Sequence, residues 1–169
     1  MSANDTVLPA LDEPLYAYVY RRLISNNFRK KGVLNPDCFV LREGEQGLSV
    51  FRADIATPYD VLQNRIDNER EQLKSDDQER RTKAQAFLET KPDVETLVHS
   101  AGYKVLRFRI ADIEQMGFEL TQPDSIGHLE IRENALKGAV FAQRKLDIKA
   151  LLDTGAARIL SVEECLARK

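Results

Sequence analysis

The sequence has no tryptophan, two cysteines and two histidines, and these shortages exclude several kinds of site. Cys38 and Cys165 lie far apart and belong to no Cys-x-x-Cys pair, which excludes a cysteine-rich zinc site. Reduced thiols in a cytosolic protein are the simplest interpretation. His99 and His128 fall on different predicted elements, so they form no evident ligand set. We therefore expect neither a metal ion nor a cofactor.

Long hydrophobic runs are also missing, and no segment approaches the roughly 20 apolar residues that span a bilayer. The first residues have no basic start and no apolar centre, unlike a secretory signal. The net charge is −2, from 25 basic and 27 acidic residues, which predicts no bulk attraction to nucleic acid or anionic lipid. These features predict a cytoplasmic protein without a membrane partner.

What remains is typical of a globular domain. Hydrophobic residues make up 43% and charged residues 31% of 169 positions, enough for one domain with its own core. Residues 1–14 are polar and contain prolines, and we expect a flexible lead-in there. Residues 15–169 are expected to form a single domain.

Strand signals recur along the chain. Aromatic and β-branched residues favour a strand over 15–24. Two apolar runs, 38–43 and 48–54, flank a glycine-bounded turn and predict a hairpin. Alternation over 103–110 predicts a strand with one buried face, and 126–133 predicts another strand.

Helix signals are clearest at Thr57 and Pro58, which suit an N-cap and a first helical position. Between Asp67 and Lys83 the only large apolar residue is Leu73, so this helix has too thin an apolar stripe to be buried. We expect one long charged helix near 58–90 that projects from the domain. Further helices are predicted at 93–102, 111–117 and 134–155, and after a capping box formed by Ser161 and Glu164.

Together these elements predict an α+β fold. We expect a small mixed or antiparallel sheet of four or five short strands, segregated helices and one long charged helix.

The segment GHLEI, residues 127–131, contains the first candidate catalytic residues. In a strand His128, Glu130 and Arg132 share one face, because side chains alternate. The functional interpretation makes His128 or Glu130 a general base or a metal ligand. We favour the solvent-facing side of an ordinary strand, since most polar strand faces carry no chemistry.

The same region resembles the PD-(D/E)xK nucleases through Asp124, Glu130, Ile131 and Arg132. That family holds a divalent metal with two carboxylates and a lysine. Here the carboxylates are too close in sequence for adjacent strands, and Arg132 cannot serve as a base. We therefore disfavour a nuclease.

A second pattern resembles the Arg-Ser-Glu arrangement of ADP-ribosyltransferases, with Arg21 or Arg22, Ser49 and Glu130 in three predicted strands. The resemblance implies that the arginine binds dinucleotide phosphates, the serine supports the nicotinamide pocket, and the glutamate stabilises the cationic sugar. His128 stands where that family has a second carboxylate. The hypothesis requires Arg22, Ser49 and Glu130 to converge within roughly 12 Å.

Residues 16–36 are basic and aromatic, without an acidic residue, and could bind nucleic acid through charge and stacking. The alternative, which we favour, is a set of core-facing tyrosines beside a solvated loop. The basic residues are Arg21, Arg22, Arg29, Lys30 and Lys31, interleaved with Tyr16, Tyr18, Tyr20 and Phe28.

The leading hypothesis is a non-enzymatic protein that acts as an interaction or adaptor component of a protein complex. It follows from the balanced charge, the scattered ionisable groups and the projecting helix. Leu62, Ile66 and Leu73 are the candidate seam for a protein partner.

The segments YRRL, GLSVFRAD and HLEI resemble a set of small uncharacterised bacterial proteins. Those proteins share an opening Tyr-Arg-Arg, a Gly-x-Ser-Val strand and a late His-x-Glu-Ile strand, and the resemblance covers 15–55 and 103–135. It implies a bacterial origin and no particular activity, so no residue role follows from it. The charged helix between the two regions is extra relative to that pattern.

Overall fold

The structure is a computed structural model of the 169-residue chain. It describes residues 13–23, 28, 34, 40–42, 48–100, 103–122, 128–133, 143–145 and 148–167. Outside these residues lie the predicted turn at 44–47, Cys38, and positions 1–12 of the predicted lead-in.

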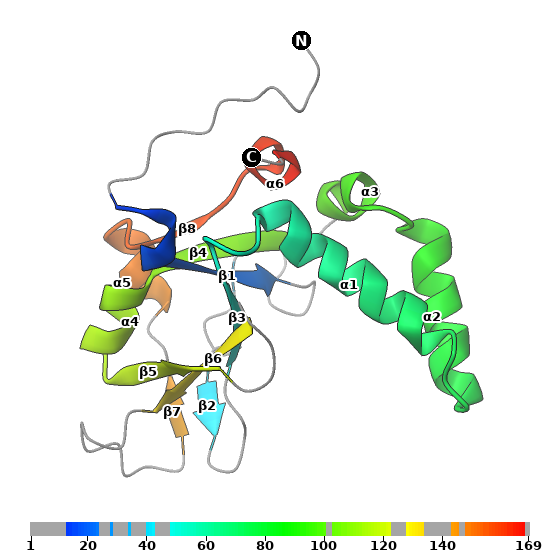
Figure 1. The fold of residues 1–169 in the computed structure, drawn as a ribbon, viewed down its shortest axis with the longest axis horizontal. Helices are drawn as coiled ribbons and strands as arrows, with labels where there is room; N and C mark the ends of the chain where they lie inside the picture. Colours follow the sequence, from blue (N-terminus) through cyan, green and yellow to red (C-terminus); the bar gives the residue numbers. More distant parts are fainter. Residues whose placement is uncertain are drawn as a thin grey trace.

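A six-stranded antiparallel sheet organises the fold, with the strand order β5-β6-β3-β1-β4-β8 (Figure 1). A second, two-stranded sheet pairs β2 with β7. The α+β class is therefore confirmed, with more strands than the four or five expected. The strands are β1 (Tyr18–Leu23), β2 (Val40–Arg42), β3 (Leu48–Arg52), β4 (Lys104–Arg109), β5 (Phe118–Thr121), β6 (His128–Glu133), β7 (Gln143–Lys145) and β8 (Ala157–Ile159).

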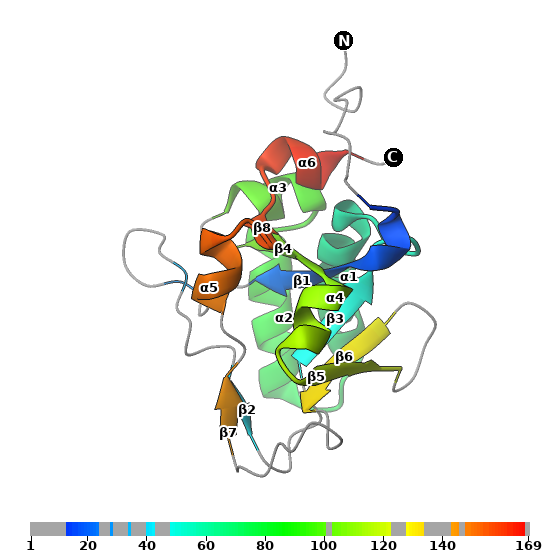
Figure 2. The same ribbon diagram turned by 90° about the vertical axis from the view of Figure 1, so that its left-hand side faces the viewer.

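Helices cover both faces of the six-stranded sheet (Figures 1 and 2). On one face α4 and α5 enclose a core that includes Val19, Leu106 and Phe108. On the other face α1, α3 and α6 enclose a second core around Tyr20 and Val105. The helices are α1 (Pro58–Gln72), α2 (Gln78–Thr90), α3 (Val94–His99), α4 (Ile110–Gln115), α5 (Ile148–Asp153) and α6 (Val162–Leu166).

The strand β4 is buried on both faces rather than one. Val105 faces one core, whereas Leu106 and Phe108 face the other, and all three are fully buried. The expectation of one solvent-facing side was wrong because β4 lies between β1 and β8, with helices on either face of the sheet. Only its arginines and Lys104 retain exposure.

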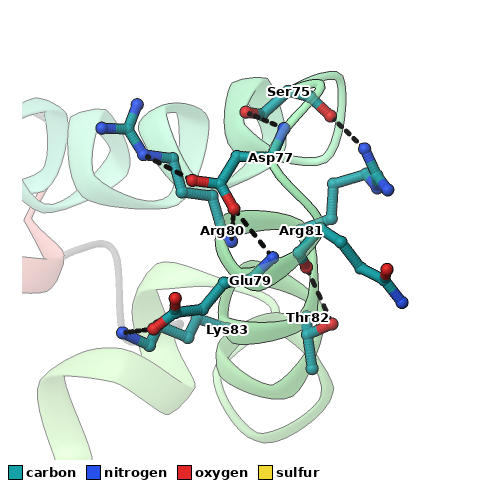
Figure 3. A network of polar contacts seen from close by, with 8 residues as sticks. Ser75, Asp77, Glu79, Arg80, Arg81, Thr82 and Lys83 are labelled. Atoms are coloured by element: carbon teal, nitrogen blue, oxygen red, sulfur yellow. Dashed lines mark hydrogen bonds and ion pairs between the residues drawn. The ribbon is translucent and has the colours of Figure 1, made fainter.

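The expected long helix at 58–90 is two helices, α1 and α2, that form an antiparallel hairpin (Figure 1). Thr57 and Asp60 make a capping box at the start of α1. Asp77 ends the intervening turn, and its carboxylate accepts hydrogen bonds from the backbone N–H groups of Glu79 and Arg80 (Figure 3). Because an aspartate at an N-cap favours a new helix start over a continuous helix, the chain reverses here.

Two other predictions, of a hairpin and of a helix, were wrong. The strands expected to form a hairpin lie in different sheets, because β2 pairs with β7 while β3 pairs with β1 and β6. The helix expected over 134–155 is interrupted, since Gln143–Lys145 is a strand and, of the residues described in this range, Ile148–Asp153 are the helical ones. The Ser161–Glu164 capping box is confirmed at α6. Among the described helices none has the length and apolar character required to cross a membrane.

Candidate functional site

A row of polar side chains crosses β5, β6 and β3 on one face of the sheet. Glu130 is the register partner of Ser49 on one side and of Thr121 on the other. His128 is the register partner of Phe51. Directly opposed residues of an antiparallel pair project to the same side, so these five residues share a face.

The serine and the histidine are in direct contact. The Nε2 atom of His128 lies 3.1 Å from the Oγ atom of Ser49. The imidazole also lies beside Phe51, with ring centroids 5.4 Å apart. The tautomer decides which of the two polar groups donates the hydrogen bond. The contact fixes the Ser49 side chain between two strands.

Glu130 is buried, with an exposed fraction of 5%. For Glu130 this contradicts the interpretation of GHLEI as the solvent-facing side of a strand, whereas His128 is half-buried. Alternation along β6 could not reveal this burial, because the period of two only separates the faces and does not say which face is covered. Nearby, the Thr121 hydroxyl is buried and has no hydrogen-bond partner among the described residues. Sequence analysis missed Thr121, because residues 118–125 gave no strand signal.

The second arginine of the Tyr-Arg-Arg segment lies on the same face. Arg22 alternates with Tyr20, whose register partner is Phe51. Its Nη1 atom donates to the Val61 carbonyl oxygen at 3.3 Å and to Asn64 Oδ1 at 3.1 Å, both in α1. Burial, followed by the nearby guanidinium groups, lowers the pKa of Arg22 to about 10. The guanidinium therefore stays cationic at neutral pH.

Arg21 alternates to the opposite face of β1, yet its side chain reaches β3. Its Nη1 atom donates to the Ser49 carbonyl oxygen at 2.8 Å. Arg21 thereby holds the backbone of Ser49, and Arg22 is the arginine that shares a face with the Ser49 side chain.

The strands β1, β3 and β6 are consecutive neighbours in the sheet. Adjacent strands lie about 4.8 Å apart, so β1 and β6 are separated by roughly 10 Å. Arg22, Ser49 and Glu130 thus lie on three neighbouring strands, although the pairing of β1 with β3 covers Val19 and Tyr20 and does not extend to Arg22. Chemically, the row offers a cation, a hydroxyl held by an imidazole, and a carboxylate.

The other sequence candidates either lie outside the described residues or stand apart from this row. Asp124 and the side chain of Arg132 lie outside the described residues. His99 ends α3, where its Nδ1 atom contacts the Glu95 carbonyl oxygen at 2.7 Å. Within the described part of the chain, no three His, Cys, Asp or Glu side chains are grouped so that they could hold a metal ion.

The basic segment 16–36 offers fewer stacking surfaces than its sequence indicates. Tyr18 and Tyr20 are buried, and Phe28 packs against the core on the α4 side, whereas Tyr16 is exposed. Buried rings cannot stack on bases. The remaining basic candidates, Arg29, Lys30 and Lys31, lie outside the described residues.

The three residues of the candidate seam for a protein partner differ in their exposure to solvent. Leu62 and Ile66 are fully buried in the core on the α1 side, so they belong to this domain. Leu73, at the end of α1, has an exposed fraction of 42%. Periodicity could not separate these roles, because all three residues lie on one apolar stripe.

Comparison of the chain with protein-family models, curated proteins and solved structures found no significant match.

Proposed function

We propose that the protein is an enzyme that acts on a dinucleotide of the NAD type, with Arg22, Ser49 and Glu130 as its site residues. The observation that carries the proposal is their arrangement. Three residue types that the resemblance groups together lie on one face of three neighbouring strands, although they are far apart in sequence.

Each residue suits a step of glycosidic cleavage. The Arg22 cation can attract the phosphates, and the Ser49 hydroxyl can hydrogen-bond the nicotinamide. When the bond between ribose and nicotinamide breaks, nicotinamide leaves with the bonding electrons as a neutral molecule. The Glu130 carboxylate stabilises the positive charge on the sugar. Water or another nucleophile then attacks the sugar carbon, and one proton is released.

One difference from the ADP-ribosyltransferase pattern bears on which nucleophile attacks the sugar. His128 replaces the second carboxylate two positions before Glu130, and it contacts Ser49. A neutral imidazole can act as a general base toward an incoming nucleophile. Hydrolysis is therefore the first activity to assay.

The test measures release of nicotinamide from NAD⁺ by chromatography. We expect the wild type to release nicotinamide, and Glu130→Gln to reduce the rate by roughly 100-fold, as losses of transition-state charge stabilisation do. Glu163→Gln is the matched control, because Glu163 is an exposed carboxylate on α6. A wild-type rate equal to the blank, or an unchanged rate in Glu130→Gln, contradicts the proposal.

A second candidate is the interaction or adaptor role, which the α1–α2 hairpin favours. Its distal part extends away from the sheet (Figure 1). Most of its charges form ion pairs within the hairpin, such as Arg65–Glu69 and Lys83–Glu79. The exposed Leu73 at its end is the remaining apolar contact point.

The adaptor role is tested by affinity purification followed by light scattering. A specific complex should be lost with Leu73→Lys and retained with Ile55→Lys, since Ile55 is equally exposed but lies outside the hairpin. A lone monomer in every preparation, or equal loss with both variants, counts against it.

A further inference from the structure

A separate pocket lies at the β4–β8 end of the sheet, away from the row that includes Glu130. Its cavity has a volume of about 210 Å³. The pocket is lined by Tyr18, Arg107, Arg109, Thr154, Gly155, Ala156 and Arg158. The described residues of its wall therefore supply three guanidinium groups and no carboxylate.

The fold brings the arginines together. Arg107 and Arg158 are register partners on β4 and β8, so they project to the same side. Arg109 follows two positions along β4 and shares that face. Gly155 lies in the turn just before β8, with a φ of 77° and no atom within 4 Å of the position of an added Cβ.

Two of the three guanidinium groups are paired with carboxylates outside the wall. Arg109 donates from Nε and Nη2 to Asp112, at 2.8 and 3.2 Å, and its Nη1 atom lies 4.0 Å from Glu13. Arg158 donates from Nη2 to Glu164. All three nitrogens of Arg109 thus face a carboxylate, whereas the pair with Glu164 engages one nitrogen of Arg158 and leaves part of its planar fork for another ligand.

Two donor groups lack a polar partner in the described structure. The guanidinium of Arg107 lies over the Tyr18 ring, 5.1 Å from its centroid, and has no ion pair with a described residue. The Nε atom of Arg158 is buried and has no hydrogen-bond partner there. Buried donors without partners are unfavourable unless a ligand or water satisfies them.

We propose that this pocket binds a phosphate-type oxyanion, with Arg107 as the principal ligand and Arg158 as a supporting donor. Guanidinium forks match the geometry of phosphate oxygens. The cavity is smaller than the roughly 300–1,000 Å³ of pockets for drug-sized ligands. It suits a phosphate group with a small remainder, and it does not depend on the NAD-type activity.

The experiment is a calorimetric titration of the full chain with inorganic phosphate and with ribose 5-phosphate, at an ionic strength matched with sodium chloride. We expect saturable binding by the wild type and at least tenfold weaker binding by Arg107→Gln. Arg80→Gln, on the exposed hairpin, is the control and should bind like the wild type. If ribose 5-phosphate binds more tightly than inorganic phosphate, the ligand of the pocket is a phosphomonoester. If the two bind equally, the ligand is free phosphate.

A second measurement is independent of how the variant folds. In the wild type, phosphate should shift the amide NMR signals of Gly155 and Ala156, and leave those around Arg80 unchanged. The proposal is overturned if the wild type binds phosphate no better than chloride, if Arg107→Gln binds equally well, or if the shifts fall elsewhere. Binding of oligonucleotides without binding of either small phosphate also overturns it.

Discussion

His128 and Ser49 are 79 residues apart in sequence, yet His128 Nε2 lies 3.1 Å from Ser49 Oγ. The contact crosses from β6 to β3, beside the register pair Ser49–Glu130. A side-chain contact of this kind adds to the backbone ladder and fixes the orientation of both polar groups. The geometry of the candidate site therefore depends on the pairing of β3 with β6.

The first prediction concerns this contact. In a double-mutant cycle, Ser49→Ala and His128→Ala should be coupled by about 0.5–1.5 kcal/mol, the usual net value of one hydrogen bond. The lower end is expected, because Ser49 is exposed. Urea unfolding of the four proteins measures the coupling. Fully additive losses of stability would show that the contact contributes nothing.

The second prediction separates the two parts of the apolar stripe on α1. Ile66 is fully buried, so Ile66→Ala should lower the free energy of unfolding by about 2–5 kcal/mol. Leu73 has an exposed fraction of 42%, and Leu73→Ala should cost less than about 0.5 kcal/mol. Urea unfolding compares them. Equal losses would mean that the distal part of α1 also packs on the domain.

The third prediction concerns the start of α2. Asp77→Ala removes the acceptor of two backbone N–H groups, and should cost about 1 kcal/mol. Its neighbour Asp76 is the control, since it is exposed and has no hydrogen bond or ion pair with a described residue. Hydrogen exchange of the α2 amides should accelerate in Asp77→Ala only. The same acceleration in Asp76→Ala would point to general charge effects.

Local signals predicted local structure well. Thr57 with Pro58 and Ser161 with Glu164 predicted two helix starts, because capping depends on neighbours within four residues. The short strand at 143–145 could not be predicted in this way. It exists because it pairs with β2, about 100 residues earlier in the chain, and long-range pairing overrides local helical pattern.

The candidate site could be predicted only in part, again because long-range strand pairing is not visible in the sequence. Arg22, Ser49 and Glu130 could be chosen by residue type, but their shared face depends on the order of strands, which the sequence did not reveal. The burial of Glu130 was also missed, because the alternation over 126–133 does not say which face of the strand is covered. The arginine pocket was also missed, although Arg107 and Arg109 alternate visibly, because the third arginine comes from a strand that was not predicted.

Cys165 gives the fourth prediction, on reactivity. Its side chain is fully buried on α6, and burial raises the pKa of the thiol to about 11. Only the thiolate reacts readily with iodoacetamide. At pH 8 labelling of Cys165 should therefore be at least 100-fold slower in the folded protein than in urea. Mass spectrometry of the peptide that contains Cys165 measures this rate separately from that of Cys38.

The same shift predicts a pH dependence of stability. An unfolded cysteine has a pKa of about 8.5, so between that pH and about 11 the unfolded chain loses a proton that folded Cys165 retains. Stability should therefore fall as pH rises through this window. Cys165→Ala should reduce the fall, because the unfolded chain then has no thiol at this position to ionise. Rapid labelling of native Cys165, or an unchanged fall in the variant, would show that the thiol is accessible to water.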